Sequence, residues 1–95
     1  MAAYVFAEIE VTDPAAYEEY RRQVLAVVTK YGGKFIVRGG RIESKEGGWK
    51  PSRMVALEFS SMEQALKWYD SPEYAPLIRL RQKASKGRLI IVEGA

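Results

Sequence analysis

The stretch Ala3–Val11, which reads AYVFAEIEV and runs directly into Thr12, Asp13 and Pro14, decides the fold class of this 95-residue chain. The stretch is short and rich in β-branched and aromatic residues, which predicts a strand. Asp13 is a favourable helix N-cap and Pro14 a favourable first helical residue. A strand that leads at once into a helix is therefore expected at the N-terminus.

Extended and helical segments then alternate to the end of the chain. The first helix, residues 14–31, has apolar residues at spacings of three and four and ends at two glycines. Gly39-Gly40 is expected to break or bulge the second strand, which would continue as an extended piece at residues 41–46. Ser60 and Glu63 have the spacing of a capping box that opens a helix. The predicted strands are residues 3–11, 34–38, 53–59 and 88–93, and a further helix starts at Ser71-Pro72.

The resulting order is β-α-β-β-α-β, which in a chain of this length fits the ferredoxin-like split βαβ arrangement. Right-handed crossovers place the helices on one side of a single antiparallel sheet. We therefore expect an α+β fold in which residues 1–95 form one domain. No functional motif is needed to predict this fold.

The other side of that sheet would be left bare. It carries Tyr4 and Phe6 from the first strand, Met54 from the third and part of the last strand. A large exposed apolar patch usually marks an interface. A second copy of the sheet, related by a two-fold axis, is the expected cover. The predicted assembly is thus a homodimer through the open sheet face, in the form of a dimeric α/β barrel.

The composition limits the reactions and metal sites that the chain can support, because it has no cysteine and no histidine. Disulfides and thiol nucleophiles are excluded, and the commonest general base and the commonest ligand for transition metals and haem are missing. We expect no cofactor and no metal. The net charge of +3 comes from scattered basic residues. No signal peptide or membrane-spanning run is recognisable, so a cytoplasmic protein without a membrane partner is expected.

Two glutamates, Glu8 and Glu58, fall on the bare face among apolar neighbours. A buried carboxylate needs a partner or has a raised pKa. In one interpretation, Arg38 or Arg53 pairs with them at the rim of the barrel. In the other, they form the polar part of a small-molecule pocket. Glu58 or Glu8 would then be a general base, and Arg38 would stabilise developing negative charge.

Aromatic residues complete this candidate ligand site. Tyr4 and Phe6 would shape the cavity. Trp68 falls off the apolar stripe of its helix, so it is expected at a pocket mouth or at the dimer seam. Tyr74 lies beside the break between the two C-terminal helices. Core packing is the simpler role for aromatic residues at helical spacing, and a solvated surface is the simpler role for the basic cluster from Arg79 to Arg88.

Several motifs occur together in a characteristic order. They are Tyr17-Glu18-Glu19-Tyr20 after Asp13-Pro14, Tyr31-Gly32-Gly33-Lys34-Phe35, Arg38-Gly39-Gly40, Glu58-Phe59, Ser61-Met62-Glu63, Trp68-Tyr69-Asp70-Ser71-Pro72-Glu73-Tyr74, Leu80-Arg81 and Val92-Glu93-Gly94. Over nearly its whole length the chain resembles the bacterial domain-of-unknown-function 1330 family, within the dimeric α/β barrel superfamily. The resemblance implies the fold and the dimer but no reaction.

Superfamily relatives include cofactor-independent monooxygenases of polyketide quinones, haem-degrading enzymes and muconolactone isomerases. This sequence departs from the haem-binding branch because it has no histidine to serve as an axial ligand. It also lacks the histidine of the histidine-aspartate pair that some related small barrels use. Analogy of fold is a weak basis for assigning a reaction.

Three classes of function follow. The first is a cofactor-independent enzyme that acts on a small, largely apolar carbonyl or carboxylate compound. The second is a non-catalytic dimeric module that binds a small ligand or has a structural role. The third is RNA binding, because RNA-recognition motifs share the element order. Residues 53–59 lack the glycine-aromatic signature of those motifs, and Glu8 and Glu58 would repel phosphate, so no nucleic-acid partner is expected.

Overall fold

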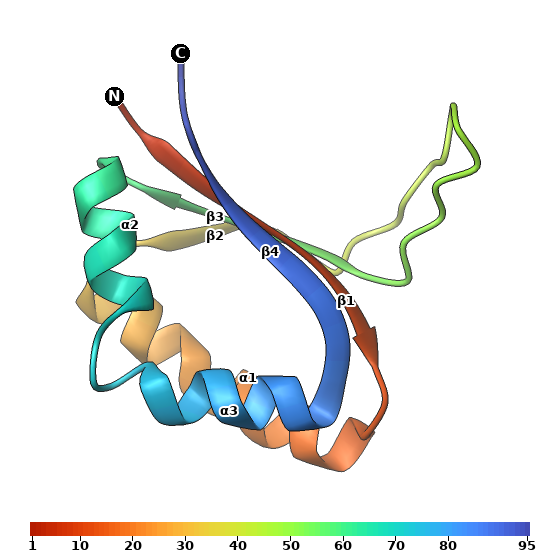
Figure 1. The fold of residues 1–95 in the computed structure, drawn as a ribbon, viewed down its shortest axis with the longest axis horizontal. Coiled ribbons are helices and arrows are strands. Elements are labelled where there is room, and N and C mark those ends of the chain that lie inside the picture. The colour runs from red at the N-terminus through yellow and green to blue at the C-terminus, as the bar shows by residue number, and fades with distance from the viewer.

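The computed structural model describes all residues, 1–95. Its elements are β1 (Ala3–Val11), α1 (Pro14–Lys30), β2 (Lys34–Arg38), β3 (Met54–Phe59), α2 (Met62–Tyr69), α3 (Ala75–Ala84) and β4 (Ser85–Glu93). The strands form one antiparallel sheet in the order β2-β3-β1-β4. All helices lie on one side of it (Figure 1). The predicted ferredoxin-like β-α-β-β-α-β fold is confirmed, and no helix is long and apolar enough to cross a membrane.

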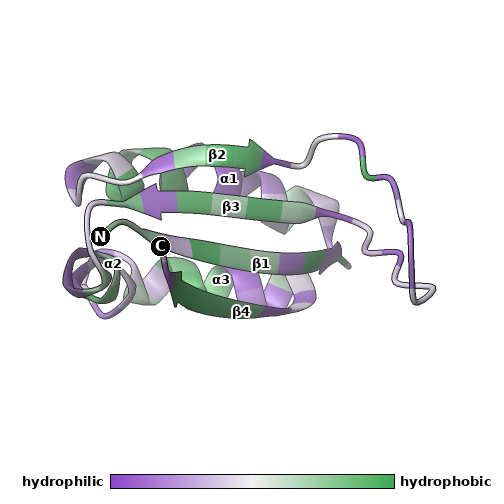
Figure 2. Cartoon of the chain, turned by 90° about the horizontal axis from the view of Figure 1, so that it is seen from above, coloured by the Kyte–Doolittle hydropathy of each residue, from purple (hydrophilic) through white to green (hydrophobic).

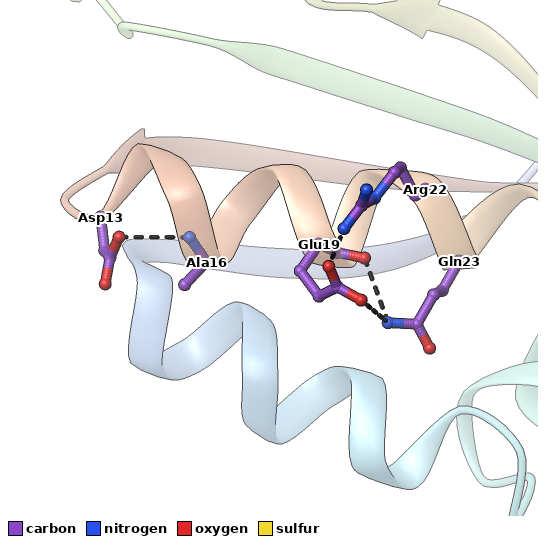
Figure 3. A network of polar contacts seen from close by, with 5 residues as sticks. All are labelled: Asp13, Ala16, Glu19, Arg22 and Gln23. Atoms are coloured by element: carbon purple, nitrogen blue, oxygen red, sulfur yellow. Dashed lines mark hydrogen bonds and ion pairs between the residues drawn. The ribbon is translucent and has the colours of Figure 1, made fainter.

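Helix α1 forms as its sequence predicts. The Asp13 carboxylate accepts a hydrogen bond from the backbone N–H of Ala16 at 3.1 Å (Figure 3). On the solvent side of the helix, Glu19 bonds the side chains of Arg22 and Gln23. The side chains buried against the sheet are Tyr17, Tyr20, Val24 and Val28. The apolar stripe therefore docks the helix, while exposed ion pairs contribute little.

Helix α2 differs from its prediction at both the cap and the buried face. Ser61 rather than Ser60 is the N-cap, and its hydroxyl accepts from the backbone N–H of Gln64 at 3.1 Å. Trp68 was expected off the apolar stripe of this helix, but it is only 1% exposed, whereas Leu66 is 44% exposed. The expected position of Trp68 at a pocket mouth or dimer seam is therefore wrong. Burying an indole removes more apolar surface from water than burying an isobutyl group, so Trp68 sets the rotation of this short helix.

The segment between β2 and β3, residues 39–53, contains no strand. The predicted extended piece at residues 41–46 is therefore wrong, because its alternating charged residues provide no apolar face to bury. The break at Gly39 is confirmed, since Gly39 has a φ of 72° and ends β2. The segment projects from the sheet as an arm (Figure 1). The indole N–H of Trp49 ties this arm to the Glu8 carboxylate at 3.1 Å.

The two faces of the sheet are occupied as the alternation predicts. Val5, Ala7 and Ile9 face the helices in the core, together with Leu57 and Phe59. The opposite face is the open face, and Figure 2 looks onto it with the helices behind. Its cross-strand pairs include Tyr4 with Glu58, Phe6 with Ala56 and Glu8 with Met54. Only β4 starts earlier than predicted, at Ser85.

Glu73 ties the α2–α3 junction to the end of α1. The Lys30 ammonium pairs with its carboxylate, and the Tyr31 hydroxyl donates to it at 2.7 Å. These contacts, that of Lys30 first, lower the pKa of Glu73 from 4.5 to about 2. Since the pKa is lower in the folded state, the stabilisation is present above pH 4.5 and is lost as the pH falls toward 2.

We predict that Glu73→Gln lowers the melting temperature at neutral pH and flattens its decline between pH 5 and pH 2. Thermal unfolding followed by circular dichroism over this pH range measures both effects. Glu46→Gln in the exposed arm is the matched control and should leave the profile unchanged. Parallel profiles for Glu73→Gln and the unsubstituted chain would contradict the assignment.

Candidate functional site

A narrow cavity lies between the sheet and the helices, on the covered face of the sheet. Its volume is about 30 Å³, which suffices for one water-sized group. Of its 16 lining residues, 12 are hydrophobic. The other members of the lining are Arg21, Arg38, Arg53 and Arg81. No carboxylate lines the cavity, so all of its charged groups are cationic.

Arg38 is the last residue of β2, and Arg53 directly precedes β3. The Arg38 guanidinium lies over the Phe35 ring, 4.2 Å from its centroid, and that of Arg53 lies 5.7 Å from the centroid of Tyr17. A Cβ at Gly39 would lie 2.1 Å from Nη1 of Arg53, so glycine lets the backbone pass this guanidinium. Neither arginine forms an ion pair with a carboxylate.

A second cationic group lies beside two tyrosines. The Arg81 guanidinium donates from Nη1 to the Tyr74 hydroxyl at 3.1 Å, and the hydroxyls of Tyr74 and Tyr20 are hydrogen-bonded at 2.8 Å. Burial raises the pKa of both tyrosines. Both hydroxyls therefore stay protonated at neutral pH, and they act as hydrogen-bond donors rather than as bases.

Trp68 forms one wall of the cavity. Its indole stacks on Tyr74 at a centroid distance of 4.3 Å and lies 5.3 Å from the ring of Phe59. The chain has two buried side-chain polar atoms without a hydrogen-bond partner, Nε1 of Trp68 and Nε of Arg53. Both residues line this cavity. Leaving such a donor unpaired costs roughly 1–3 kcal/mol. A hydrogen-bond acceptor from outside the chain would remove this cost, because the chain itself supplies none.

The structure divides the predicted site residues between the two faces of the sheet. The residues that line the cavity on the covered face are Arg38, Arg53, Trp68 and Tyr74. The residues on the open face are Tyr4, Phe6, Glu8 and Glu58. Because the sheet lies between them, Glu58 and Arg38 do not meet at one small molecule within a chain. The residues predicted to form one pocket therefore lie at two separate sites, one on each face of the sheet.

The two glutamates also have partners other than those expected. Glu58 pairs with Lys34 at 3.1 Å, and Glu8 pairs with Arg88 at 2.8 Å, so neither pairs with Arg38 or Arg53. Hydrogen bonds from Arg88 and then Trp49 lower the pKa of Glu8. The expectation of a raised pKa is therefore wrong for Glu8, which is ionised at neutral pH and a weak base.

Sequence reasoning missed part of the polar lining of the cavity. The tyrosines of α1 were not singled out as site residues, and Arg81 was expected in a solvated basic cluster. Arg81 is 9% exposed, which corrects that expectation. The sequence did contain a signal of this burial. Arg81 continues the helical spacing of Tyr74 and Leu77, which places it on the buried stripe of the helix.

The chain is similar in sequence to one protein family. The family model described as domain of unknown function (DUF1330) matches residues 2–95. No curated protein sequence matches the chain.

Solved structures match the chain in fold at low sequence identity. A protein of unknown function from Rhodopseudomonas palustris, RPA0582, is 18% identical with a TM-score of 0.75, and the match covers 99% of this chain and 82% of that one. SnoaB, a cofactor-independent oxygenase from Streptomyces nogalater, is 12% identical with a TM-score of 0.65, covering 99% and 92%. A dimeric protein of unknown function and ferredoxin-like fold from Bacteroides fragilis is 8% identical with a TM-score of 0.65, covering 98% and 96%.

Proposed function

The chain belongs to the DUF1330 family, whose function is unknown, and from this premise we propose that it is a cofactor-independent enzyme. Its substrate is a small, largely apolar carbonyl or carboxylate compound, which places one oxygen in the cavity between the sheet and the helices. One observation carries the proposal: this cavity is lined by apolar and aromatic side chains and by guanidinium groups, with no acidic group.

A substrate of this kind supplies the hydrogen-bond acceptor that the lining of the cavity lacks. Its oxygen fits the space of about 30 Å³ and accepts from the unpaired donors of Arg53 and Trp68, while its apolar body lies against the hydrophobic side chains that border this space. Guanidinium groups stabilise an oxygen anion most strongly where water is excluded. The site is therefore suited to lowering the pKa of a C–H group beside a carbonyl, by stabilising the enolate that forms.

This assignment moves the chemistry away from Glu58. That carboxylate lies on the open face, where it is paired with Lys34. Arg38 and Arg53 keep the proposed role of stabilising negative charge, here on the substrate oxygen inside the cavity, and solvent water accepts the proton from the carbon outside it. The fold shared with SnoaB, which is a cofactor-independent oxygenase, supports chemistry without a cofactor on this scaffold.

Deuterium incorporation into 2-tetralone in D₂O, followed by NMR, tests the proposal because it measures enolisation directly. We expect the protein to accelerate exchange beside the carbonyl and Arg53→Met to reduce the acceleration at least tenfold. Arg41→Met in the exposed arm is the matched control and should retain it. Binding of 2-tetralone without any acceleration would instead support a non-catalytic ligand-binding module. An absence of both would refute the proposal.

We also propose that the protein is a homodimer through its open face. Cross-strand pairing aligns an apolar row there, made of Val37, Ala56, Phe6 and Ile90. Ion pairs border this row on both sides, Lys34 with Glu58 and Glu8 with Arg88. Ile90 is 60% exposed in the single chain, so a second copy would bury substantial apolar surface. The dimeric Bacteroides fragilis protein has the same fold.

Light scattering should give twice the 10.8 kDa mass of one chain at low micromolar concentration. Ile90→Lys should shift the mass to that of a monomer, since it places a charge in the apolar row. Leu25→Lys, at an exposed apolar position on α1, is the control and should remain dimeric. A monomeric unsubstituted chain would refute the dimer.

A further inference from the structure

We propose that Arg81 is the recognition point for a carboxylate and that the ligand reaches it from a groove at the β4 edge of the sheet. The proposal deepens the function above and rests on it, because it names the charged group of the substrate. It assigns the ligand to the class of small aromatic monocarboxylates.

The first observation is a buried guanidinium without a counter-ion. Arg81 is 9% exposed, and no carboxylate lies within ion-pair distance. It donates one hydrogen bond, to the neutral hydroxyl of Tyr74. Burying a charge in this way is costly unless an opposite charge arrives. An anionic ligand supplies that charge.

The second observation is a surplus of donors around Arg81. The hydroxyls of Tyr20 and Tyr74 carry two protons between them, but their mutual hydrogen bond uses only one. Whichever hydroxyl donates, the other retains an O–H group for which the structure supplies no acceptor. The guanidinium carries five N–H groups, of which one is bonded to Tyr74 and another faces Tyr69. A carboxylate offers two acceptor oxygens, which match a guanidinium N–H and a hydroxyl together.

The third observation is a route to this position. A groove of about 450 Å³ lies at the β4 edge, lined in part by Tyr69, Gln82 and Lys86. It shares Ala7, Ile9, Leu89 and Arg81 with the inner cavity. Arg81 is the long, flexible member of this shared boundary, so movement of its side chain joins the two spaces.

The volumes and charges of the two spaces define the ligand. The inner cavity of about 30 Å³ holds a single small group, whereas the groove has the size of an ordinary small-molecule site. Lys86 adds positive charge to the groove, and the one carboxylate there, Glu8, is paired with Arg88 at 2.8 Å. The ligand's ring therefore lies in the groove against Tyr69 and Leu89, with its carboxylate at Arg81.

Trp68 is a built-in reporter for this site. The chain has two tryptophans, so Trp49→Phe leaves Trp68 as the single indole, stacked on Tyr74 at 4.3 Å. Benzoate and its neutral isostere benzamide can then be titrated while Trp68 fluorescence is followed. We expect benzoate to bind at least tenfold more tightly than benzamide. Arg81→Met in this background should abolish that preference, and Arg79→Met, at an exposed position of the same helix, should preserve it.

A milder variant keeps the test decisive if Arg81→Met fails to fold. Arg81→Lys keeps the positive charge but removes the planar guanidinium, so it should weaken benzoate binding several-fold with little effect on benzamide. Equal binding of benzoate to the Arg81→Met chain would overturn the inference. So would failure of the parent chain to bind benzoate, while the 2-tetralone exchange assay would still report on the proposed function separately.

Discussion

Replacing Trp68 with alanine is expected to destabilise the protein by about 3–5 kcal/mol, the usual cost of deleting a large aromatic side chain from a core. The indole is 1% exposed and packs on Tyr74 at 4.3 Å, on Phe59 at 5.3 Å and on Tyr69 at 6.0 Å. Its removal enlarges the cavity that it lines, and we expect the neighbouring side chains not to fill the added space. Urea unfolding followed by circular dichroism measures the loss.

The second tryptophan provides the matched control. Trp49 is 55% exposed on the arm, and one hydrogen bond to Glu8 ties it down. Trp49→Ala should therefore cost no more than about 1 kcal/mol, the worth of a single hydrogen bond. Similar losses for the two alanine variants would contradict the placement of Trp68 in the core.

Replacing Gly87 with alanine is expected to destabilise the protein by about 1–3 kcal/mol through overpacking. A Cβ at Gly87 would lie 2.1 Å from the carbonyl oxygen of Glu8, although real Cβ contacts of this kind stay beyond 3.0 Å. The opposing atom belongs to the backbone of β1, which is paired on both sides, so it moves only if the ladder to β4 is distorted. Thermal unfolding measures the loss, and hydrogen exchange should show weaker protection of the β1 and β4 amides.

Gly40→Ala is the control for this prediction. A Cβ at Gly40 meets nothing within 4 Å, and its backbone does not have a positive φ. Its substitution should be neutral or slightly stabilising, because alanine restricts the unfolded chain more than glycine does. Equal effects at Gly40 and Gly87 would show that the close approach of β4 to β1 is absent in solution.

The sequence predicted most of the secondary structure because the relevant signals are local. The bounds of β1 and β2 were predicted as observed, and α1 begins where Asp13 and Pro14 indicate. Alternation along β1 also predicted which side chains lie on the open face. Failures came where the local signal was ambiguous, as at Ser60 and Ser61, where adjacent residues of the same type compete for one cap.

The candidate site was predicted less well. Arg38, Arg53, Trp68 and Tyr74 were identified as ligand contacts, and all line the cavity, although the predicted cavity was on the other face of the sheet. Glu8 and Glu58 were expected to pair with arginines that the sheet keeps away from them. Arg81 was not identified, because its basic neighbours indicated a solvated surface more strongly than its helical spacing with Tyr74 and Leu77 indicated burial.

The element order, the fold class, the family and the open apolar face could all be predicted from the sequence, since each follows from periodicity, caps and motifs along the chain. Which polar groups lack a partner, and on which side of the sheet the cavity lies, depend instead on how the elements pack together. Whether a donor such as Arg53 Nε or Trp68 Nε1 finds an acceptor depends on every element packed around it. Hydrogen-bond satisfaction in a core is a property of the whole packed molecule, and no local pattern of residues encodes it.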